Sequence, residues 1–177
     1  GYWPVGPTKK IAVETFDHIG IRVRDEERAL QFYQLLGFEV AHRSESDAVV
    51  IIKNPQNLEI NLVVNANNPD DDQNILMDIQ PKFPGFTHLA LRVKSIGETI
   101  QALEENGIEI TQGPVSFGQQ FGVSVFIRDP DRNVIELRGR MESSENLSDI
   151  APYEPNWHWT PAFTSFKFTR VRFEKRR

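Results

Sequence analysis

The feature that most constrains the fold of this chain is an internal repeat with a histidine at the same place in each copy. Residues 16–23 (FDHIGIRV) recur seventy residues later as 86–93 (FTHLALRV). The register then holds without a gap to residues 40 and 110, with seven identities in twenty-five positions. A repeat of this length indicates two copies of one supersecondary unit.

Each copy predicts the element order βαβββ. The first helix is expected over 26–36, with Asp25 as its N-cap and Gly37 at its end, and the second runs from a Ser95 cap to Gly107. Alternating apolar residues predict the strands. In chain order these are expected at 16–23, 38–43, 48–53 and 58–64 in the first copy, and at 86–93, 108–111, 123–128 and 134–138 in the second.

The repeat also divides the chain into parts. We expect an N-terminal extension over 1–12, a first βαβββ module over 13–66, a linker over 67–84, a second βαβββ module over 85–140, and an aromatic and basic C-terminal tail over 141–177. In the tail, partial alternation over 164–173 predicts one more strand. The linker length allows the modules to pair within one chain or to swap between two.

The bulk composition excludes several classes of partner. A net charge of −5 gives no reason to expect binding to nucleic acid or to an anionic membrane surface. No apolar run is long enough to span a bilayer. The absence of cysteine rules out disulfides and thiolate chemistry. We therefore expect a cytoplasmic protein.

The last strands of the two copies place more polar residues in equivalent positions. Residues 54–62 align with 129–137, so that Asn61 is the counterpart of Glu136, as His18 is of His88. Each of the four is flanked by Ile or Leu, which would point into the helix-facing core, so alternation directs all four to the opposite face. Two imidazoles and one carboxylate are a ligand set for a divalent cation that leaves positions open for substrate.

These motifs resemble the vicinal oxygen chelate superfamily of glyoxalases, extradiol dioxygenases, epimerases, fosfomycin-resistance enzymes and bleomycin-binding proteins. The resemblance covers residues 16–138. It is carried by DHIGI at 17–21, FYQLLGF at 32–38, THLAL at 87–91 and DPDRNVIEL at 129–137. It implies an α+β fold in which two tandem βαβββ modules pack their mixed sheets into a cup-shaped, partly open barrel around a metal site. In that family the first and fourth strands carry the ligands, which implies His18, His88 and Glu136 here.

Asn61 departs from the glyoxalase I pattern, in which a Glu at this position ligates metal and takes part in proton transfer. An amide is no general base and is a poor ligand for a borderline metal. Glu59, two residues earlier on the same face, substitutes for it only with a bulge or register shift. The gap-free alignment favours Asn61 as a residue that contacts the substrate or the ligands, and a His, His, Glu set as in extradiol dioxygenases and fosfomycin-modifying enzymes.

Other polar residues are weaker candidates. Arg22, Arg92 and Arg138 share strand parity with the ligands and are candidates for binding an anionic substrate, although a strand-end arginine is as often solvated. His42 and His158 are candidate acid–base groups for which a surface or packing role is the alternative. Trp157 and Trp159 flank His158 and form either a lid over the substrate or a packed tail.

The resemblance leaves three functions open. It narrowly favours Fe2+ dioxygenase chemistry on a substrate that chelates through two oxygens. Across these functions the candidate catalytic residues are Glu136, Glu59 and Asn61, with Glu59 as the base that only the isomerase requires. The alternative is a glyoxalase- or epimerase-like isomerase or lyase that uses Ni2+, Zn2+, Co2+ or Mn2+. A third function is non-catalytic binding of a drug or metabolite. A homodimer is expected in each case, and the substrate and metal stay undetermined.

Overall fold

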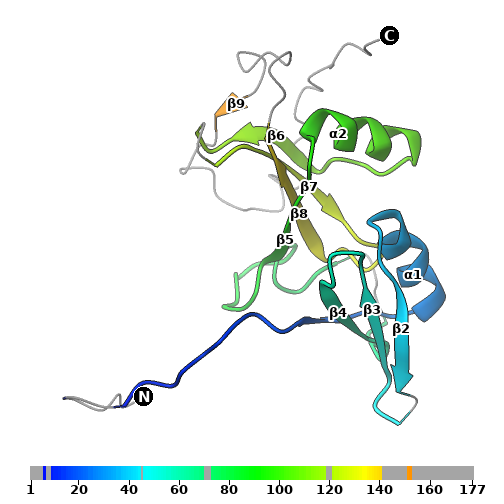
Figure 1. Ribbon diagram of the computed structural model, residues 1–177. Coiled ribbons are helices and arrows are strands. Elements are labelled where there is room, and N and C mark those ends of the chain that lie inside the picture. Colours follow the sequence, from blue (N-terminus) through cyan, green and yellow to red (C-terminus); the bar gives the residue numbers. More distant parts are fainter. Residues whose placement is uncertain are drawn as a thin grey trace.

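Two βαβββ modules with helices on the same side of their sheets make up the fold (Figure 1). The computed structural model describes Gly6 and residues 9–44, 46–69, 73–118, 121–140 and 151–152. The first module contains β1 (Ile19–Arg22), α1 (Glu26–Leu35), β2 (Glu39–Ser44), β3 (Val49–Lys53) and β4 (Glu59–Val63). The second contains β5 (His88–Arg92), α2 (Ile96–Glu105), β6 (Gln112–Ser116), β7 (Val123–Arg128) and β8 (Val134–Gly139).

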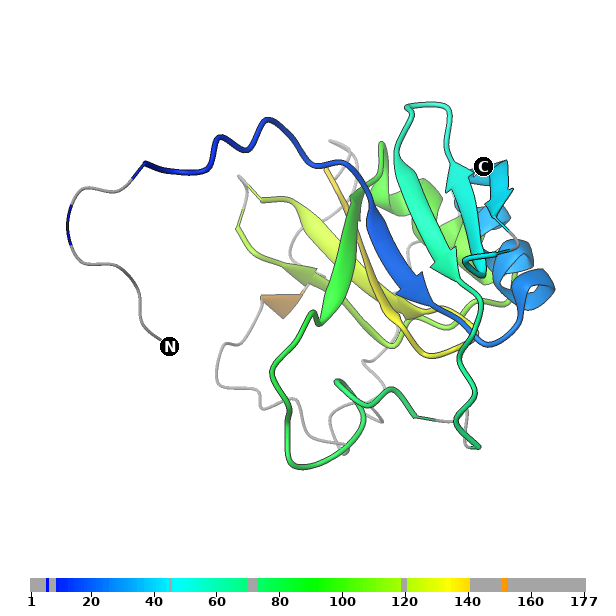
Figure 2. The same cartoon turned by 90° about the horizontal axis from the view of Figure 1, so that it is seen from below.

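Both sheets have the same mixed topology. The strand orders are β1-β4-β3-β2 and β5-β8-β7-β6, and β9 (Ala151–Pro152) extends the second sheet beside β6. The first and fourth strands of each module pair in parallel, β1 with β4 and β5 with β8, and the remaining pairs inside each module are antiparallel. This arrangement confirms the predicted α+β class with two repeated modules. Figure 2 shows the two sheets from a second direction.

Local signals set the limits of both helices as the sequence predicts. The Asp25 side chain accepts a hydrogen bond from the Arg28 amide, and the Ser95 hydroxyl accepts one from the Glu98 amide. Each bond satisfies an amide of the first turn that has no partner within the helix. Gly37, at φ +91°, ends the chain's helical path after α1 at little conformational cost.

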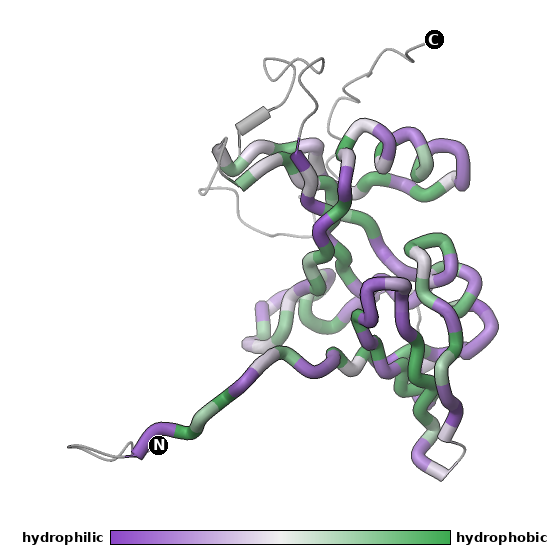
Figure 3. Tube along the Cα trace, in the orientation of Figure 1, coloured by the Kyte–Doolittle hydropathy of each residue, from purple (hydrophilic) through white to green (hydrophobic). Residues whose placement is uncertain are grey.

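One hydrophobic core joins the modules within the chain. Its members come from both sheets and both helices, and the apolar stretches of the strands that supply it stand out along the trace in Figure 3. Ile60 and Leu62 on β4, like Ile135 and Leu137 on β8, are at most 2% exposed. The residues between them on each strand, including Asn61 and Glu136, therefore face away from this core.

Polar contacts across the module boundary involve the turn between β7 and β8. The Tyr33 hydroxyl donates to Asp129 Oδ2 at 2.8 Å. Asp131 Oδ1 accepts from the Arg24 amide at 3.1 Å and from Arg28 Nη2 at 2.7 Å. The two Asp131 bonds tie the start of α1 to a turn 103 and 107 residues later in the chain, and the Tyr33 bond ties the end of α1 to the same turn, 96 residues later.

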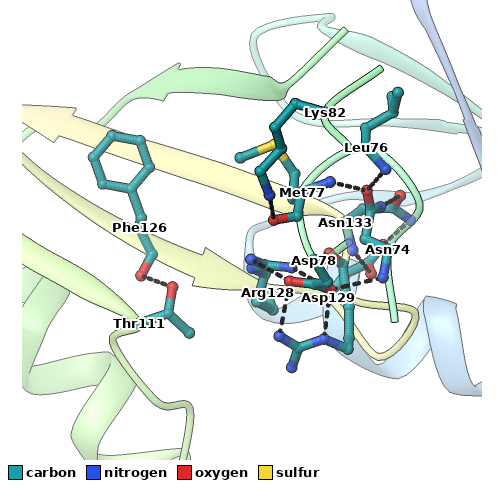
Figure 4. Close-up of polar contacts among 11 residues, drawn as sticks. Asn74, Leu76, Met77, Asp78, Lys82, Thr111, Phe126, Arg128, Asp129 and Asn133 are labelled. Carbon is teal, nitrogen blue, oxygen red and sulfur yellow. Dashed lines mark hydrogen bonds and ion pairs between the residues drawn. The ribbon is translucent and has the colours of Figure 1, made fainter. Parts of the chain in front are cut away.

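The linker is partly folded onto the second sheet rather than forming a bare polar connection. Met77 is 5% exposed and packs with Val115, Phe126 and Val134 in a second, smaller apolar cluster. Next to it, the Asp78 carboxylate lies among polar partners that include Arg128 (Figure 4). The segment 74–82 therefore covers part of the sheet face that lies opposite the helices.

Two strand predictions were wrong in position. β1 begins at Ile19 rather than residue 16, because its pairing with β4 starts at Ile19 and Ile60. The strand expected over 108–111 is replaced by β6 at Gln112–Ser116, which runs through Gly113 and Pro114. The strand predicted over 164–173 lies outside the described residues.

Candidate metal centre

His88 and Glu136 form one part of the candidate site, in which Glu136 is buried and the His88 side chain is 34% exposed. Glu136 is 3% exposed on the central strand β8, and His88 opens the neighbouring edge strand β5. His88 Nε2 lies 3.0 Å from Glu136 Oε1. The parallel register pairs Ala90 with Glu136. His88 is two residues before Ala90 on the same strand, so its side chain and that of Glu136 lie on one face of the sheet. A nitrogen and an oxygen lone pair are thus brought together from two strands.

The second oxygen of Glu136 is held by two donors. Oε2 accepts a hydrogen bond from the buried Ser124 hydroxyl at 2.7 Å and an ion-pair contact from Arg138 Nη2 at 2.9 Å. Burial is the largest single influence on the pKa of Glu136 and acts to raise it. Hydrogen bonds from His88 and Ser124, with the charge of Arg138, outweigh burial and hold that pKa below its usual value, so the carboxylate is anionic at neutral pH.

Aromatic rings fix the groups around this carboxylate. The His88 ring makes an edge contact with Phe126, with ring centres 5.7 Å apart. The Arg138 guanidinium lies 4.7 Å from the centre of the Phe117 ring, a cation–π distance. Thr87 Oγ1 is 2.8 Å from the other ring nitrogen of His88, Nδ1. Both the imidazole and the guanidinium are thereby restricted to a narrow range of orientations.

A second group of potential ligands lies in the first module. Asp17, His18 and Glu59 each have a ligand atom within 4.8 Å of the others, and they are the only described His, Asp or Glu residues that form such a group of three or more. His18 Nδ1 is 2.5 Å from Asp17 Oδ1 and 3.6 Å from Glu59 Oε2. Glu59 Oε1 is 3.6 Å from Lys53 Nζ. Taken as a group, these side chains of the first module are more exposed than those of His88 and Glu136 in the second module.

Glu59 approaches His18 without any irregularity in its own strand. The pairing of β3 with β4 is continuous from Val49–Val63 to Lys53–Glu59. Asn61 stays on the same face, and its Oδ1 is buried without a hydrogen-bond partner among the described residues. The bulge that the sequence analysis required for Glu59 is therefore unnecessary, because His18 precedes β1 and extends past its first pair, Ile19–Ile60.

The predicted ligands thus lie in two groups. The structure brings His88 to Glu136 in one module and His18 to Glu59 and Asp17 in the other, and no described trio within 4.8 Å joins them. Both groups lie on the sheet faces that point away from the helices, at the two edge strands β1 and β5.

The other predicted site residues have varied surroundings. Arg22 Nε donates to Asn65 Oδ1, and Arg138 is engaged by Glu136 and Ser124. Arg92, with no partner among the described residues, also lines an apolar cavity of about 220 Å³ between the two helices. His42 is exposed on β2. Trp157, His158 and Trp159 lie outside the described residues.

Sequence reasoning missed Ser124, Phe126 and Asp17 as neighbours of the ligands. Ser124 and Phe126 occupy alternate positions of β7, and the register pairs Phe126 directly with Glu136. Once the pairing of β7 with β8 is known, alternation along 123–128 places Ser124 and Phe126 on the same face as Glu136. The only sequence signal for Asp17 as a neighbour of the site is that it directly precedes His18.

The fold and these paired ligand groups define a class of protein. The chain belongs to the Glyoxalase/Bleomycin resistance protein/Dioxygenase superfamily, whose family model matches residues 15–137. That range contains the first module, the second module up to β8, and all the candidate ligands described above.

Individual relatives agree with this membership. The chain is 27% identical over 142 residues to the glyoxalase domain-containing protein RDO1 of Mycosarcoma maydis, covering 76% of this chain and 73% of that protein. A glyoxalase/dioxygenase crystal structure from Nostoc punctiforme is similar with a TM-score of 0.59 at 20% identity, covering 77% of this chain and all of that one. The fosfomycin resistance protein FosX from Listeria monocytogenes matches with a TM-score of 0.55 at 18% identity, over 72% of this chain and 91% of that one. The structural matches show a shared fold.

Proposed function

We propose that this chain is a divalent-metal enzyme that binds a small molecule through two oxygen atoms and moves a proton on it. The observation that carries the metal is the contact of His88 Nε2 with Oε1 of the buried Glu136 at 3.0 Å. The observation that favours proton transfer is the Glu59 carboxylate 3.6 Å from His18.

The residues present fit a divalent cation. Imidazole nitrogen and carboxylate oxygen are the ligands that Zn2+, Mn2+, Co2+, Ni2+ and Fe2+ share. His18, His88 and Glu136 are the proposed ligands, and Glu59 replaces the carboxylate that Asn61 does not supply. When bound, such a cation would stabilise negative charge that develops on substrate oxygens.

Each residue of the first module has a role in this proposal. Glu59 Oε2 takes a proton from the substrate carbon next to the chelating oxygens and returns it to a neighbouring atom. Lys53 Nζ, 3.6 Å from Glu59 Oε1, is the positive charge next to this carboxylate. The Asn61 amide, whose Oδ1 has no hydrogen-bond partner among the described residues, binds a polar group of the substrate. Arg92, which by strand alternation lies on the same face of β5 as His88, is the proposed contact for an anionic substituent.

Fe2+ dioxygenase chemistry is the second candidate. Its support is the set of two histidines and one carboxylate, which matches the facial arrangement of non-haem iron oxygenases. It requires no base at position 59. Non-catalytic binding is a third candidate, which the retention of His88, Glu136 and the groups around them disfavours.

Metal analysis and one substitution separate these functions. We expect protein purified anaerobically, without added metal, to contain Ni, Zn, Co or Mn near one per chain. Near-stoichiometric iron instead supports the dioxygenase, and absence of metal after reconstitution supports binding alone. With proton exchange at a carbon next to a carbonyl as the assay, Glu59→Gln is expected to lose activity by a factor of about 100 or more. Gln56→Glu, which changes the charge in the exposed turn before β4, is the control and is expected to keep wild-type activity.

We also propose that the chain forms a homodimer. Ile11, Val13 and Phe16 on the N-terminal segment are each at least 78% exposed, as is Phe86 before β5. Apolar side chains gathered in this way favour contact with another protein surface. Light scattering after gel filtration is expected to give twice the chain mass for the wild type and a lower mass for Ile11→Ser/Val13→Ser. A monomeric wild type contradicts the proposal.

The two described helices are neither long nor apolar enough to cross a membrane.

A further inference from the structure

The two oxygens of the Glu136 carboxylate differ in how many donors they face. Oε2 accepts from Ser124 Oγ at 2.7 Å and from Arg138 Nη2 at 2.9 Å. Within the described part of the chain, Oε1 faces only His88 Nε2, at 3.0 Å. One oxygen therefore has its lone pairs engaged by the protein itself, while the other is directed at the histidine that the proposed metal would share.

Arg138 determines which way the Ser124 hydroxyl points. Arg138 Nε lies 3.1 Å from Ser124 Oγ and can only donate, because a guanidinium has no acceptor. Ser124 Oγ must accept from it, and this leaves the hydroxyl hydrogen for Glu136 Oε2. The three side chains form a closed ring in which Arg138 donates to Ser124 and to Glu136, and Ser124 donates to Glu136.

Water does not replace this ring, because its centre is shut off from solvent. Ser124 is 0% exposed and Glu136 3% exposed. The Phe117 ring lies against the Arg138 guanidinium and keeps it over the carboxylate. In such surroundings, a charge-assisted hydrogen bond is shorter and stronger than in water, and its loss is not made good by solvent.

The first module has no such ring, and the strand register shows why. Ser124 pairs with Arg138 on β7 and β8, and the pair at the same place on β3 and β4 is Val49 with Val63. Phe126, opposite Glu136, is matched by Ile51, opposite Asn61. Valine side chains have no hydrogen-bond donor for a carboxylate. At the positions that match Ser124 and Arg138, the first module therefore cannot form this ring of hydrogen bonds.

We propose that Ser124 is a positioning residue that, with Arg138, holds Oε2 of Glu136 and presents Oε1 alone, so that Glu136 serves as a one-oxygen metal ligand. This inference rests on the proposed metal site. It assigns Arg138 to the carboxylate rather than to an anionic substrate, and it makes the second module the preorganised half of the site. Groups that orient a ligand in this way typically contribute about 10- to 100-fold to metal affinity.

Titration of the full-length apoprotein with Co2+ tests the inference. In Ser124→Ala the dissociation constant for Co2+ is expected to rise by about 10- to 100-fold. The visible absorption of bound Co2+ is expected to weaken as well, because a released Oε2 joins the ion and a higher coordination number gives weaker bands. Ser124→Thr, which keeps the hydroxyl, is expected to restore most of both properties. Ser116→Ala on β6 is the matched control and should bind as the wild type does.

A second pair of variants guards against loss of folding in the serine variant. Arg138→Met removes both donations, to Ser124 and to Oε2, and Arg140→Met removes an exposed arginine two residues later. The measure for this pair is the Co2+ spectrum, because removing a positive charge near a cation by itself strengthens binding. We expect the weakened bands in Arg138→Met only.

The outcomes separate the inference from the proposed function. Wild-type protein that binds no Co2+ overturns both. Wild-type binding with an unchanged affinity and spectrum in Ser124→Ala, or an unchanged spectrum in Arg138→Met, overturns the positioning role and leaves the metal site in place.

Discussion

Asp78 attaches the linker to the second sheet through two arginines. Its carboxylate accepts from the Asn74 amide at 2.6 Å and contacts both Arg128 and Arg132, with distances of 2.9–3.2 Å. Only 7% of the Asp78 side chain is exposed. Burial, the largest influence, acts to raise the pKa of Asp78, but the hydrogen bonds from Arg132, Asn74 and Arg128 together lower it below its ordinary value.

Replacing Asp78 with Asn is expected to destabilise the fold at neutral pH. The change leaves the buried Arg128 without its counter-charge, and breaking a buried pair in this way costs about 3–5 kcal/mol. Urea unfolding at pH 7 measures the loss. Asp47→Asn, at an exposed turn, is the control and should change stability by less than about 0.5 kcal/mol. Equal stability of the two variants would contradict the role of Asp78.

The pH dependence of the same residue has a defined sign. A carboxyl whose pKa is lower in the folded protein stabilises the fold above its unfolded pKa, and that stability is lost as the pH falls through the folded value. The wild type is therefore expected to lose stability below about pH 4. The difference between the wild type and Asp78→Asn should shrink over the same range, which unfolding curves at pH 3 and pH 7 compare directly.

At the scale of elements, the helices were more predictable than the strands. A cap such as Asp25 or Ser95 acts within three residues, so the sequence alone carries the information. β6 depends on a partner instead. Ile108 and Ile110 alternate like a strand but are partly buried against the core outside any ladder. The pairing with β7 begins at Gln112 and skips from there to Val115.

The same distinction applies to the candidate site. His18, His88 and Glu136 were identifiable because the repeat places them in matching positions. Ser124 was not, since a lone serine in an apolar strand is informative only when its cross-strand neighbour is known. The approach of Glu59 to His18 depends on where β1 begins, and that limit is set by pairing with β4 rather than by local sequence.

Gly113 in β6 is expected to tolerate no side chain. Its φ is +97°, and an added Cβ would lie 2.6 Å from the Ser124 carbonyl oxygen. Gly113→Ala should lower stability by about 2–4 kcal/mol through strain and the forced movement of β7. Gly20→Ala, where nothing lies within 4 Å, is the matched control. Thermal unfolding of both variants gives the comparison, and similar melting temperatures would contradict the prediction.

At the scale of the whole molecule, the hydrogen bond between Tyr33 and Asp129 joins the two modules. The two residues are 96 positions apart in the sequence. Burial is the main cause that raises the pKa of both groups, and the hydrogen bond between them is one of the interactions that offset the burial of Asp129. The pairing holds the β7–β8 turn, and with it Glu136, against the first module.

A double-mutant cycle measures this connection. Tyr33→Phe and Asp129→Asn are each expected to destabilise the fold, and the pair should couple by about 1–2 kcal/mol, as contacting hydrogen-bonded residues do. Tyr33→Phe should also leave one cooperative transition, because the apolar core is common to both modules. Strict additivity of the two changes would show that the bond contributes nothing to module pairing.

The valine pair at positions 49 and 63 bears on how a duplicated gene diverges. After duplication, one copy of a unit can keep an inherited chemical task while selection relaxes on the other. Here the second copy has serine and arginine around its carboxylate, and the first has valine at both matching positions and asparagine where the second has glutamate. With the proposed metal site, the second half would anchor the cation, and the first half would be the part that can vary with the substrate.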